Sequence, residues 1–305
     1  MKVNHTDYDD PLKAYEYWLS TMKEVRSNRV LCSLDDTLKE SSKLPMPTEY
    51  SDEFLGVYVF GGHKEFKLED HEAAFASFRK YSEKFYPLYF FYADWECRGL
   101  NDGFNEIVLR YGPMKVIEIN PITDITDYSK FMIWDLWKHI PEENEKILTF
   151  QNDGYLVNSG WEPFINEHDP DYIGSYYTDY TPEGWKDILY IKDVEKYNVN
   201  QPPDFLMNGG FSFRKRSKMI QISNLISKDD IDYGKIESDA LDQYNKSRTS
   251  LELYTPPRLN EDMAFCYLGF GKNIFKPVPE KVANKFSSCS YNVDIDSFGF
   301  HGYGF

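Results

Sequence analysis

The sequence has few cysteines and no closely spaced pair of them. Its 305 residues contain four, at Cys32, Cys97, Cys266 and Cys289, and none forms a C-x-x-C motif. This spacing disfavours a zinc site or a disulfide framework, so we expect reduced thiols in a reducing compartment. No apolar run approaches the roughly 18 residues of a membrane span, and the opening segment MKVNHTDYDD does not resemble a signal peptide. These absences predict a cytoplasmic protein without a membrane span.

Positive charge is also scarce. The 34 lysines and arginines are outnumbered by 50 aspartates and glutamates, which gives a net charge of −16. An average surface of this sign repels polyanions, so nucleic acid and anionic membranes are not expected partners. A small anion such as a nucleotide can still bind where a metal ion or helix N-termini offset its charge.

The first 50 residues differ in pattern from the rest. Apolar residues recur at helical spacing at Leu12, Tyr15, Trp18, Leu19 and Met22, and a polar stretch with prolines follows. We interpret residues 1–50 as an N-terminal helical arm with a linker, and residues 51–305 as one domain. The sequence shows no internal repeat.

Residues 54–150 alternate between strand-like and helix-like segments. Strands are predicted at 54–60, 88–94, 115–119 and 146–150, and helices at 68–85, 103–112 and 127–140. This alternation predicts an α/β fold with a mostly parallel sheet flanked by helices. Ligands bind at the carboxyl ends of such strands, where Asp94, Asn120 and Asp153 are expected.

The second half is less regular. We expect a strand at 171–177, a long loop at 178–204 that leaves room for a short helix, and two short strands joined by a Gly209-Gly210 turn. Helices are predicted at 215–226 and after Asn260, which is a candidate N-cap. The charged segment 227–250 is expected to form an exposed excursion.

Taken singly, the candidate site residues have ordinary structural explanations. An aspartate after a strand, such as Asp153, is commonly a turn residue. Glu261 and Asp262 in the first turn of a helix interact favourably with the helix dipole. His301, between aromatic residues and glycines, fits a buried and hydrogen-bonded structural histidine.

The order of the motifs is more specific than any one of them. Six short segments follow one another between residues 128 and 301: YSKFMIWDLW, FQND, DYIG, NGGFSFR, NEDMAF and FGFH. The series resembles the GT-A-fold glycosyltransferases and, more closely over residues 114–305, an uncharacterised family of glycosyltransferase-like domains. Residues 54–113 match only the general nucleotide-binding alternation.

The resemblance implies a GT-A-type (Rossmann-like) fold and a metal site. GT-A enzymes end a core strand with D-x-D, whose final aspartate binds a divalent metal that bridges the two phosphates of the donor. Asp153 has that final position, while Gln151 replaces the first carboxylate and leaves metal dependence open. His301 matches the C-terminal histidine that often completes the site, and its imidazole favours Mn²⁺ over Mg²⁺. Gln151 and Asn152 are then candidates for substrate hydrogen bonds.

The resemblance also implies inverting sugar transfer from a nucleotide diphosphate, with UDP as the default, to a hydroxyl acceptor. Asp262 takes the position of the general base and Glu261 that of a supporting residue. A carboxylate with an ordinary pKa near 4 is ionised at pH 7 and needs only to lie within about 3 Å of the hydroxyl. Gly209 and Gly210 resemble the glycine turn that lines the substrate pocket. Arg214 is placed to contact either a phosphate or a surface carboxylate.

Two other functions stay open. A sugar nucleotidyltransferase shares the fold type but uses a glycine-rich basic loop after the first strand, which VFGGHKEFKLED matches poorly. A non-catalytic carbohydrate-binding or assembly protein is favoured by Gln151 and opposed by the joint presence of Asp153, Asp262 and His301. The sugar, the acceptor and the oligomeric state are left open.

Overall fold

The computed structural model describes residues 46–61, 66–93, 102–112, 114–178, 184–247, 258–289, 294 and 296–302. All structural statements below refer to these residues. The predicted N-terminal arm lies outside them except for residues 46–50, and Asp94, Cys32 and Cys97 lie outside them as well.

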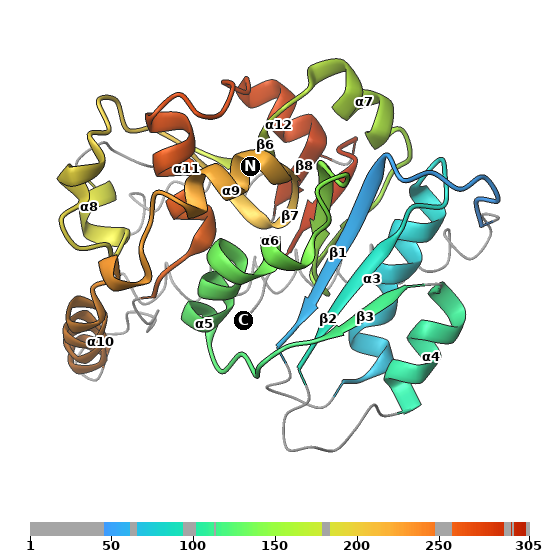
Figure 1. Ribbon diagram of the computed structural model, residues 1–305, viewed down its shortest axis with the longest axis horizontal. Coiled ribbons are helices and arrows are strands. Elements are labelled where there is room, and N and C mark those ends of the chain that lie inside the picture. Colours follow the sequence, from blue (N-terminus) through green and yellow to red (C-terminus); the bar gives the residue numbers. More distant parts are fainter. Residues whose placement is uncertain are drawn as a thin grey trace, which may run out of the picture.

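Six strands form the central sheet, in the order β3-β2-β1-β4-β7-β6. They are β1 (Phe54–Phe60), β2 (Leu88–Tyr92), β3 (Lys115–Glu118), β4 (Lys146–Phe150), β6 (Tyr172–Tyr177) and β7 (Leu206–Lys215). Strands β1 to β4 run parallel, and β7 is antiparallel to both of its neighbours. The predicted α/β fold with a mostly parallel sheet is confirmed (Figure 1).

Helices cover both faces of this sheet (Figure 1). One face carries α3 (Leu68–Tyr81), α4 (Asp102–Tyr111), α7 (Trp161–His168) and α12 (Glu280–Phe286). The other carries α5 (Ile125–Lys130), α6 (Leu136–His139), α9 (Arg216–Ser223) and α11 (Glu261–Gly271). A π-helical turn, η4 (Phe131–Asp135), joins α5 to α6 and divides the single helix that the sequence predicts.

The core is rich in aromatic side chains, because alternate residues of the strands point their rings toward the helices. Phe54 at the start of β1 packs edge-on against Trp161 and Tyr86, with centroid distances of 4.8 and 5.3 Å. Gly56, two residues further, leaves room for the ring of Phe78 on α3. Burial of such rings contributes roughly 1.5–3 kcal/mol each and fixes α3 against the sheet.

The Gly209-Gly210 pair lies inside one continuous strand, so the predicted strand–turn–strand arrangement is wrong. Gly174 of β6 pairs with Ser212 and the next residue, Ser175, pairs with Asn208. Residues 209–211 of β7 are therefore an unpaired bulge. The glycines permit close approach of neighbouring side chains rather than a chain reversal.

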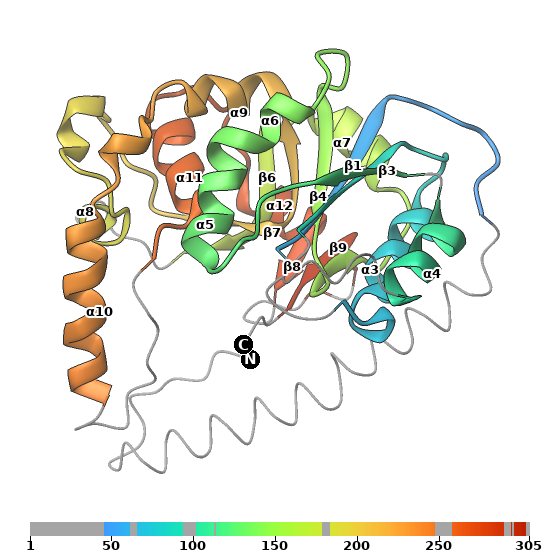
Figure 2. The same cartoon turned by 60° about the horizontal axis from the view of Figure 1, so that its bottom comes forward.

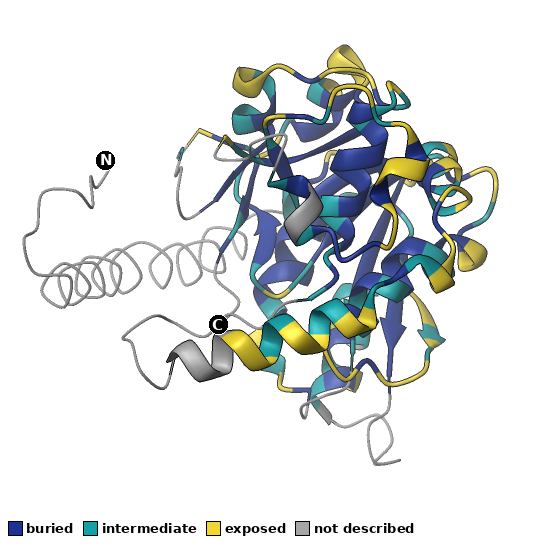
Figure 3. Ribbon diagram, turned by 90° about the vertical axis from the view of Figure 1, so that its left-hand side faces the viewer, coloured by how far each residue is buried: buried dark blue, intermediate teal, exposed yellow. Residues whose placement is uncertain are grey.

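The described part of the charged segment, residues 227–247, is mostly helical, and the side chains of residues 227–242 are exposed or half-buried except for Ile231. It contains the 3₁₀ turn η6 (Lys228–Asp230) and α10 (Tyr233–Ser247), which projects from the body of the domain (Figures 2 and 3). The predicted loop at 178–204 contains two short helical turns, α8 (Trp185–Ile188) and η5 (Val194–Tyr197). Within the described ranges, no helix combines the length and apolar character that crossing a membrane requires.

Glu162 on α7 is a buried carboxyl group with a single hydrogen bond. Its Oε1 accepts from the backbone amide of Glu83 at 2.7 Å, and its Oε2 has no hydrogen-bond partner among the described residues. Burial raises the pKa of Glu162 to about 7, and the nearby Glu83 and Glu53 carboxylates add to the shift. The folded protein therefore holds this proton more tightly than the unfolded chain does.

We expect Glu162→Gln to stabilise the protein at pH 8 but not at pH 4.5. Because the folded-state pKa is raised, the favourable contribution of protonated Glu162 is present below pH 4.5 and is lost as pH rises toward 7. The variant should gain up to about 3 kcal/mol of unfolding free energy at pH 8, measured by urea denaturation. Glu167→Gln, at an exposed position on the same helix, is the control. An equal gain at both pH values would contradict this account.

Candidate active site

A two-residue hairpin positions Asp153 beyond the end of β4. Gln151 and Gly154 exchange backbone hydrogen bonds of 3.0 and 3.1 Å, which places Asn152 and Asp153 at the tip before β5 (Gly154–Leu156). FQND is thus a turn, and it also holds a carboxylate at the carboxyl edge of the sheet.

A second, smaller sheet brings His301 to this carboxylate. It has the order β5-β9-β8, with β8 at Ser287–Cys289 and β9 at Gly299–His301. His301 pairs with Gly154, and its Nε2 lies 3.7 Å from Asp153 Oδ1. Burial lowers the pKa of His301 and raises that of Asp153, so the imidazole is neutral near pH 7 and its Nε2 can offer a lone pair.

The glycine pair of β7 lies between His301 on one side and the acidic pair Glu261 and Asp262 on the other. A Cβ on Gly210 would lie 2.0 Å from His301 Nε2, so only glycine allows the imidazole its place. A Cβ on Gly209 would lie 2.5 Å from Glu261 Oε1 and 3.4 Å from Asp262 Cβ. The bulge therefore brings the backbone into contact with the proposed metal residue on one side and the acidic pair on the other.

We expect Gly210→Ala to cost about 1–3 kcal/mol of unfolding free energy, because the new methyl group collides with a ring in a packed site. Gly234→Ala is the matched control, because the nearest atom to its Cβ would be Asp232 Oδ1 at 3.6 Å. That control should be neutral or slightly stabilising. Thermal unfolding of both variants measures the difference, and equal stability would show that His301 does not lie against Gly210.

Asp262 is half-buried in the first turn of α11, behind Asn260 at the predicted N-cap position. Its Oδ2 accepts from Gly209 N at 3.3 Å and its Oδ1 from Met263 N at 2.7 Å. Burial raises the pKa of Asp262 to about 7, and the adjacent Glu261 carboxylate adds to the shift. The expectation of an ordinary pKa near 4 is therefore wrong, because the sequence does not show how deeply this carboxyl group lies.

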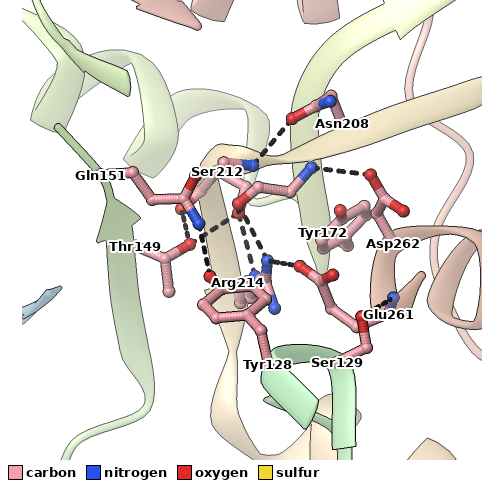
Figure 4. A network of polar contacts seen from close by, with 12 residues as sticks. Tyr128, Ser129, Thr149, Gln151, Tyr172, Asn208, Ser212, Arg214, Glu261 and Asp262 are labelled. Atoms are coloured by element: carbon pink, nitrogen blue, oxygen red, sulfur yellow. Dashed lines mark hydrogen bonds and ion pairs between the residues drawn. The ribbon is translucent and has the colours of Figure 1, made fainter. Parts of the chain in front are cut away.

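Arg214 and Glu261 form a buried ion pair beneath the site (Figure 4). Arg214 Nη2 donates to Glu261 Oε1 at 3.1 Å, and the two side chains are 0% and 6% exposed. The carboxylate partner of Arg214 is therefore buried and does not lie at the surface, while a contact of Arg214 with phosphate stays a prediction. Glu261 binds Arg214 through its side chain, and its backbone amide donates to Ser129 Oγ at 3.2 Å.

Gln151 binds Tyr128 on α5, a residue that the sequence placed in a motif but not in the site. Its Nε2 donates to Tyr128 Oη at 2.7 Å, which leaves the amide oxygen of Gln151 and the phenol proton of Tyr128 for other partners (Figure 4). Burial raises the pKa of Tyr128, so the phenol stays protonated and can donate.

A cavity of about 410 Å³ opens beside the hairpin, at the carboxyl ends of β1 and β4. Gln151, Asn152 and Asp153 line it on one side, and Tyr128 lines it from α5. Asp70 and His71 line it from the start of α3, where no sequence motif pointed to a site. His71 is fixed there by a 2.6 Å hydrogen bond between its Nδ1 and Tyr58 Oη.

The residues present fit a divalent cation that also has ligands from the substrate. Two atoms that each bind one ion at about 2.1 Å can be at most about 4.2 Å apart, and the 3.7 Å between Asp153 Oδ1 and His301 Nε2 meets this limit. Within the described ranges, no cluster of three or more acidic, histidine or cysteine side chains could hold a metal. A metal here would therefore take its other ligands from phosphate and water.

Solved structures that resemble this chain include two glycosyltransferases of low sequence identity. Mouse xyloside xylosyltransferase 1, in its apo form, is 11% identical with a TM-score of 0.47, and the alignment covers 84% of this chain and 98% of that chain. Core-mannan synthase A from Aspergillus fumigatus, in its Mn/GDP form, is 10% identical with a TM-score of 0.41, and the alignment covers 72% and 70%. Similarity at this level does not extend to activity or substrate.

None of the curated proteins matches the sequence significantly. A family model described as Protein of unknown function (DUF5672) matches residues 113–301. This stretch is more than half of the chain and runs from the end of α4 to His301. The protein is therefore a member of the DUF5672 family.

Proposed function

We propose that this protein transfers a sugar from a nucleotide diphosphate donor to a hydroxyl acceptor, with inversion at the anomeric carbon. One observation carries the proposal. Asp153 and His301 meet on one side of the β7 glycine pair, at the Gly210 end, and Asp262 binds the backbone of Gly209 on the other. The first pair suits a metal-bound diphosphate, and the second group suits proton removal from an acceptor.

The charges of the cavity support metal dependence. Its lining includes Asp70, Asp124 and Asp153 but no lysine or arginine among the described residues. A diphosphate is itself anionic, so a cation bound there would offset both sets of charges. We assign that role to Mn²⁺ or Mg²⁺ held by Asp153 and His301, and when bound it would stabilise the charge on the leaving diphosphate.

Asp262 would act on the acceptor. The ionised carboxylate takes the hydroxyl proton while the acceptor oxygen attacks the anomeric carbon and the bond from that carbon to the diphosphate oxygen breaks. Two backbone amides hold the carboxylate, so each oxygen keeps a lone pair for the proton. A pKa of about 7 makes Asp262 a stronger base than an exposed aspartate.

Donor turnover tests the proposal. The full chain is incubated with UDP-, GDP- and dTDP-sugars, with water or simple sugars as acceptors, and the release of free nucleoside diphosphate is measured with Mn²⁺ or with EDTA. We expect one donor class to turn over only when the metal is present. Nucleotide binding without turnover would favour the non-catalytic binding protein, and neither binding nor turnover would contradict the proposal.

A further inference from the structure

One arginine connects the groups that surround Asp262. Arg214 is fully buried beside two neighbouring aromatic rings, with its guanidinium carbon 5.5 Å from the centroid of Tyr172 and 5.4 Å from that of Phe265. Its Nε donates to Ser212 Oγ at 2.9 Å, and its Nη2 donates to the carbonyl oxygen of Gly209 at 2.9 Å and to Glu261 Oε1. Arg214 thus binds the backbone and the carboxylate that flank the base.

The bulge explains why side-chain donors are needed there. Gly209 has no partner on β6, so its carbonyl oxygen depends on side chains for its hydrogen bonds in the core. Arg214 Nη2 and Ser212 Oγ, each at 2.9 Å, supply the missing donors, and Thr149 Oγ1 holds Ser212 Oγ at 2.7 Å (Figure 4). The backbone N–H of Gly209 itself donates to Asp262 Oδ2.

The charges around Asp262 are few. Glu261 is adjacent in sequence and disfavours ionisation of Asp262, whereas Arg214 favours it. Cys266 on α11, Tyr172 on β6 and Tyr128 on α5 also face this group of side chains. Burial raises the pKa of all three, so they are neutral near pH 7.

We propose that Arg214 is a positioning residue for the transfer reaction: it holds the Gly209 backbone and the Glu261 carboxylate so that Asp262 faces the acceptor. This inference rests on the proposed function, in which Asp262 is the base. It reassigns Arg214 from the substrate to the residues that orient the base, and it assigns Glu261 as the counter-charge of Arg214.

The titration of Asp262 tests this inference without any substrate. Carboxyl carbon resonances of ¹³C-labelled aspartate are followed from pH 4 to 9, and Asp262→Asn identifies the signal. We expect Glu261→Gln to lower the midpoint of Asp262 by about one pH unit, because a like charge is removed and Arg214 stays. Arg214→Met should raise it by about one unit, because the two carboxyl groups must then share a proton. Unchanged midpoints, or shifts of the same sign, would overturn the inference.

Arg79 provides the matched control. It is also a buried arginine that donates to backbone carbonyl groups, those of Tyr111 and Tyr86, but it lies at the far end of α3. Arg79→Met should lower stability without moving the Asp262 midpoint. If Arg214→Met fails to fold, the Asp262 midpoint in Glu261→Gln still tests the inference. Glutamine keeps an oxygen that can accept a hydrogen bond from Arg214.

Arg214→Lys distinguishes a positioning role of Arg214 from a purely structural one. Arg214→Lys keeps the charge but loses the Nε contact with Ser212 and the planar group that places Nη2 against Gly209 and Glu261, so hydrogen exchange of the Gly209 amide should become faster. In the transfer assay, kcat should fall by roughly ten- to a hundredfold with the donor KM retained. A loss confined to melting temperature, with kcat unchanged, would show that Arg214 acts on stability alone. Shifted midpoints without any donor turnover would instead refute the proposed function and leave the interaction of Arg214 with Asp262 in place.

Discussion

Asp262→Asn is expected to lower the rate of sugar transfer by about 10²- to 10⁴-fold and to leave donor binding nearly unchanged. Asparagine keeps an oxygen for the Gly209 amide but cannot take the acceptor proton. Transfer is measured as nucleoside diphosphate release, and donor binding by calorimetric titration. Asp204→Asn, at an exposed position, is the control. Loss of donor binding together with transfer would contradict the assignment of Asp262 to the acceptor side.

The same base determines the pH dependence of the wild-type enzyme. Because the pKa of Asp262 is raised to about 7, the carboxylate is mostly protonated below that value and cannot act as a base. The transfer rate should therefore rise with pH through about 7 and level off above it. A rate that is constant from pH 5 to 8 would show that the base ionises well below this range.

Asp153→Ala is expected to weaken Mn²⁺ binding in the presence of nucleoside diphosphate by at least about 10- to 100-fold. The variant removes one of the two proposed protein ligands, and His301→Ala should have a similar effect. Free Mn²⁺ is measured by electron paramagnetic resonance at a fixed nucleotide concentration.

Asp70→Asn separates ligation from charge. Asp70 lines the same cavity, so its replacement removes a negative charge without removing a proposed ligand. We expect a much smaller effect on Mn²⁺ than Asp153→Ala produces. Equal losses in the two variants would show that Asp153 acts through its charge alone, and the metal site would then have to lie elsewhere.

The parts of the fold with strong local patterns could be predicted from the sequence. Residues 54–60 and 147–150 are mostly apolar, aromatic or β-branched, and strands form with the predicted bounds 54–60 and 146–150. Asn260 before a carboxylate pair gives an equally local signal for the start of α11. In each case a few neighbouring residues determine the structure.

The parts of the fold that depend on contacts distant in sequence could not be predicted from the sequence. Nothing near Gly209 shows that β6 shifts register opposite it, so a turn and a bulge give the same local pattern. Arg214 occurs in a segment that alternates like an edge strand, and only the packing of Tyr172 and Phe265 shows that it is buried. The raised pKa of Asp262 has the same origin, because burial is a property of the folded molecule.

The proximity of the two proposed metal ligands also depends on the fold. Asp153 and His301 are far apart in the chain, and pairing of β5 with β9 brings their side chains within 3.7 Å of each other, while their role as ligands stays a prediction. Tyr128 and Asp70 were missed as site residues for opposite reasons. Tyr128 belongs to a motif but its partner, Gln151, is known only from the fold, whereas Asp70 has no motif at all.

A melting-temperature screen of the full chain tests the metal–diphosphate site most directly. UDP, GDP, CMP and dTDP are each added with and without Mn²⁺, to the wild type and to Asp153→Ala. We predict that one nucleotide raises the melting temperature only with Mn²⁺, by the equivalent of roughly 2.7 kcal/mol at 100 times its Kd, and that Asp153→Ala abolishes the shift. If no nucleotide shifts the wild type, or the shift is the same without metal, FQND is an ordinary turn and the metal–diphosphate site is refuted.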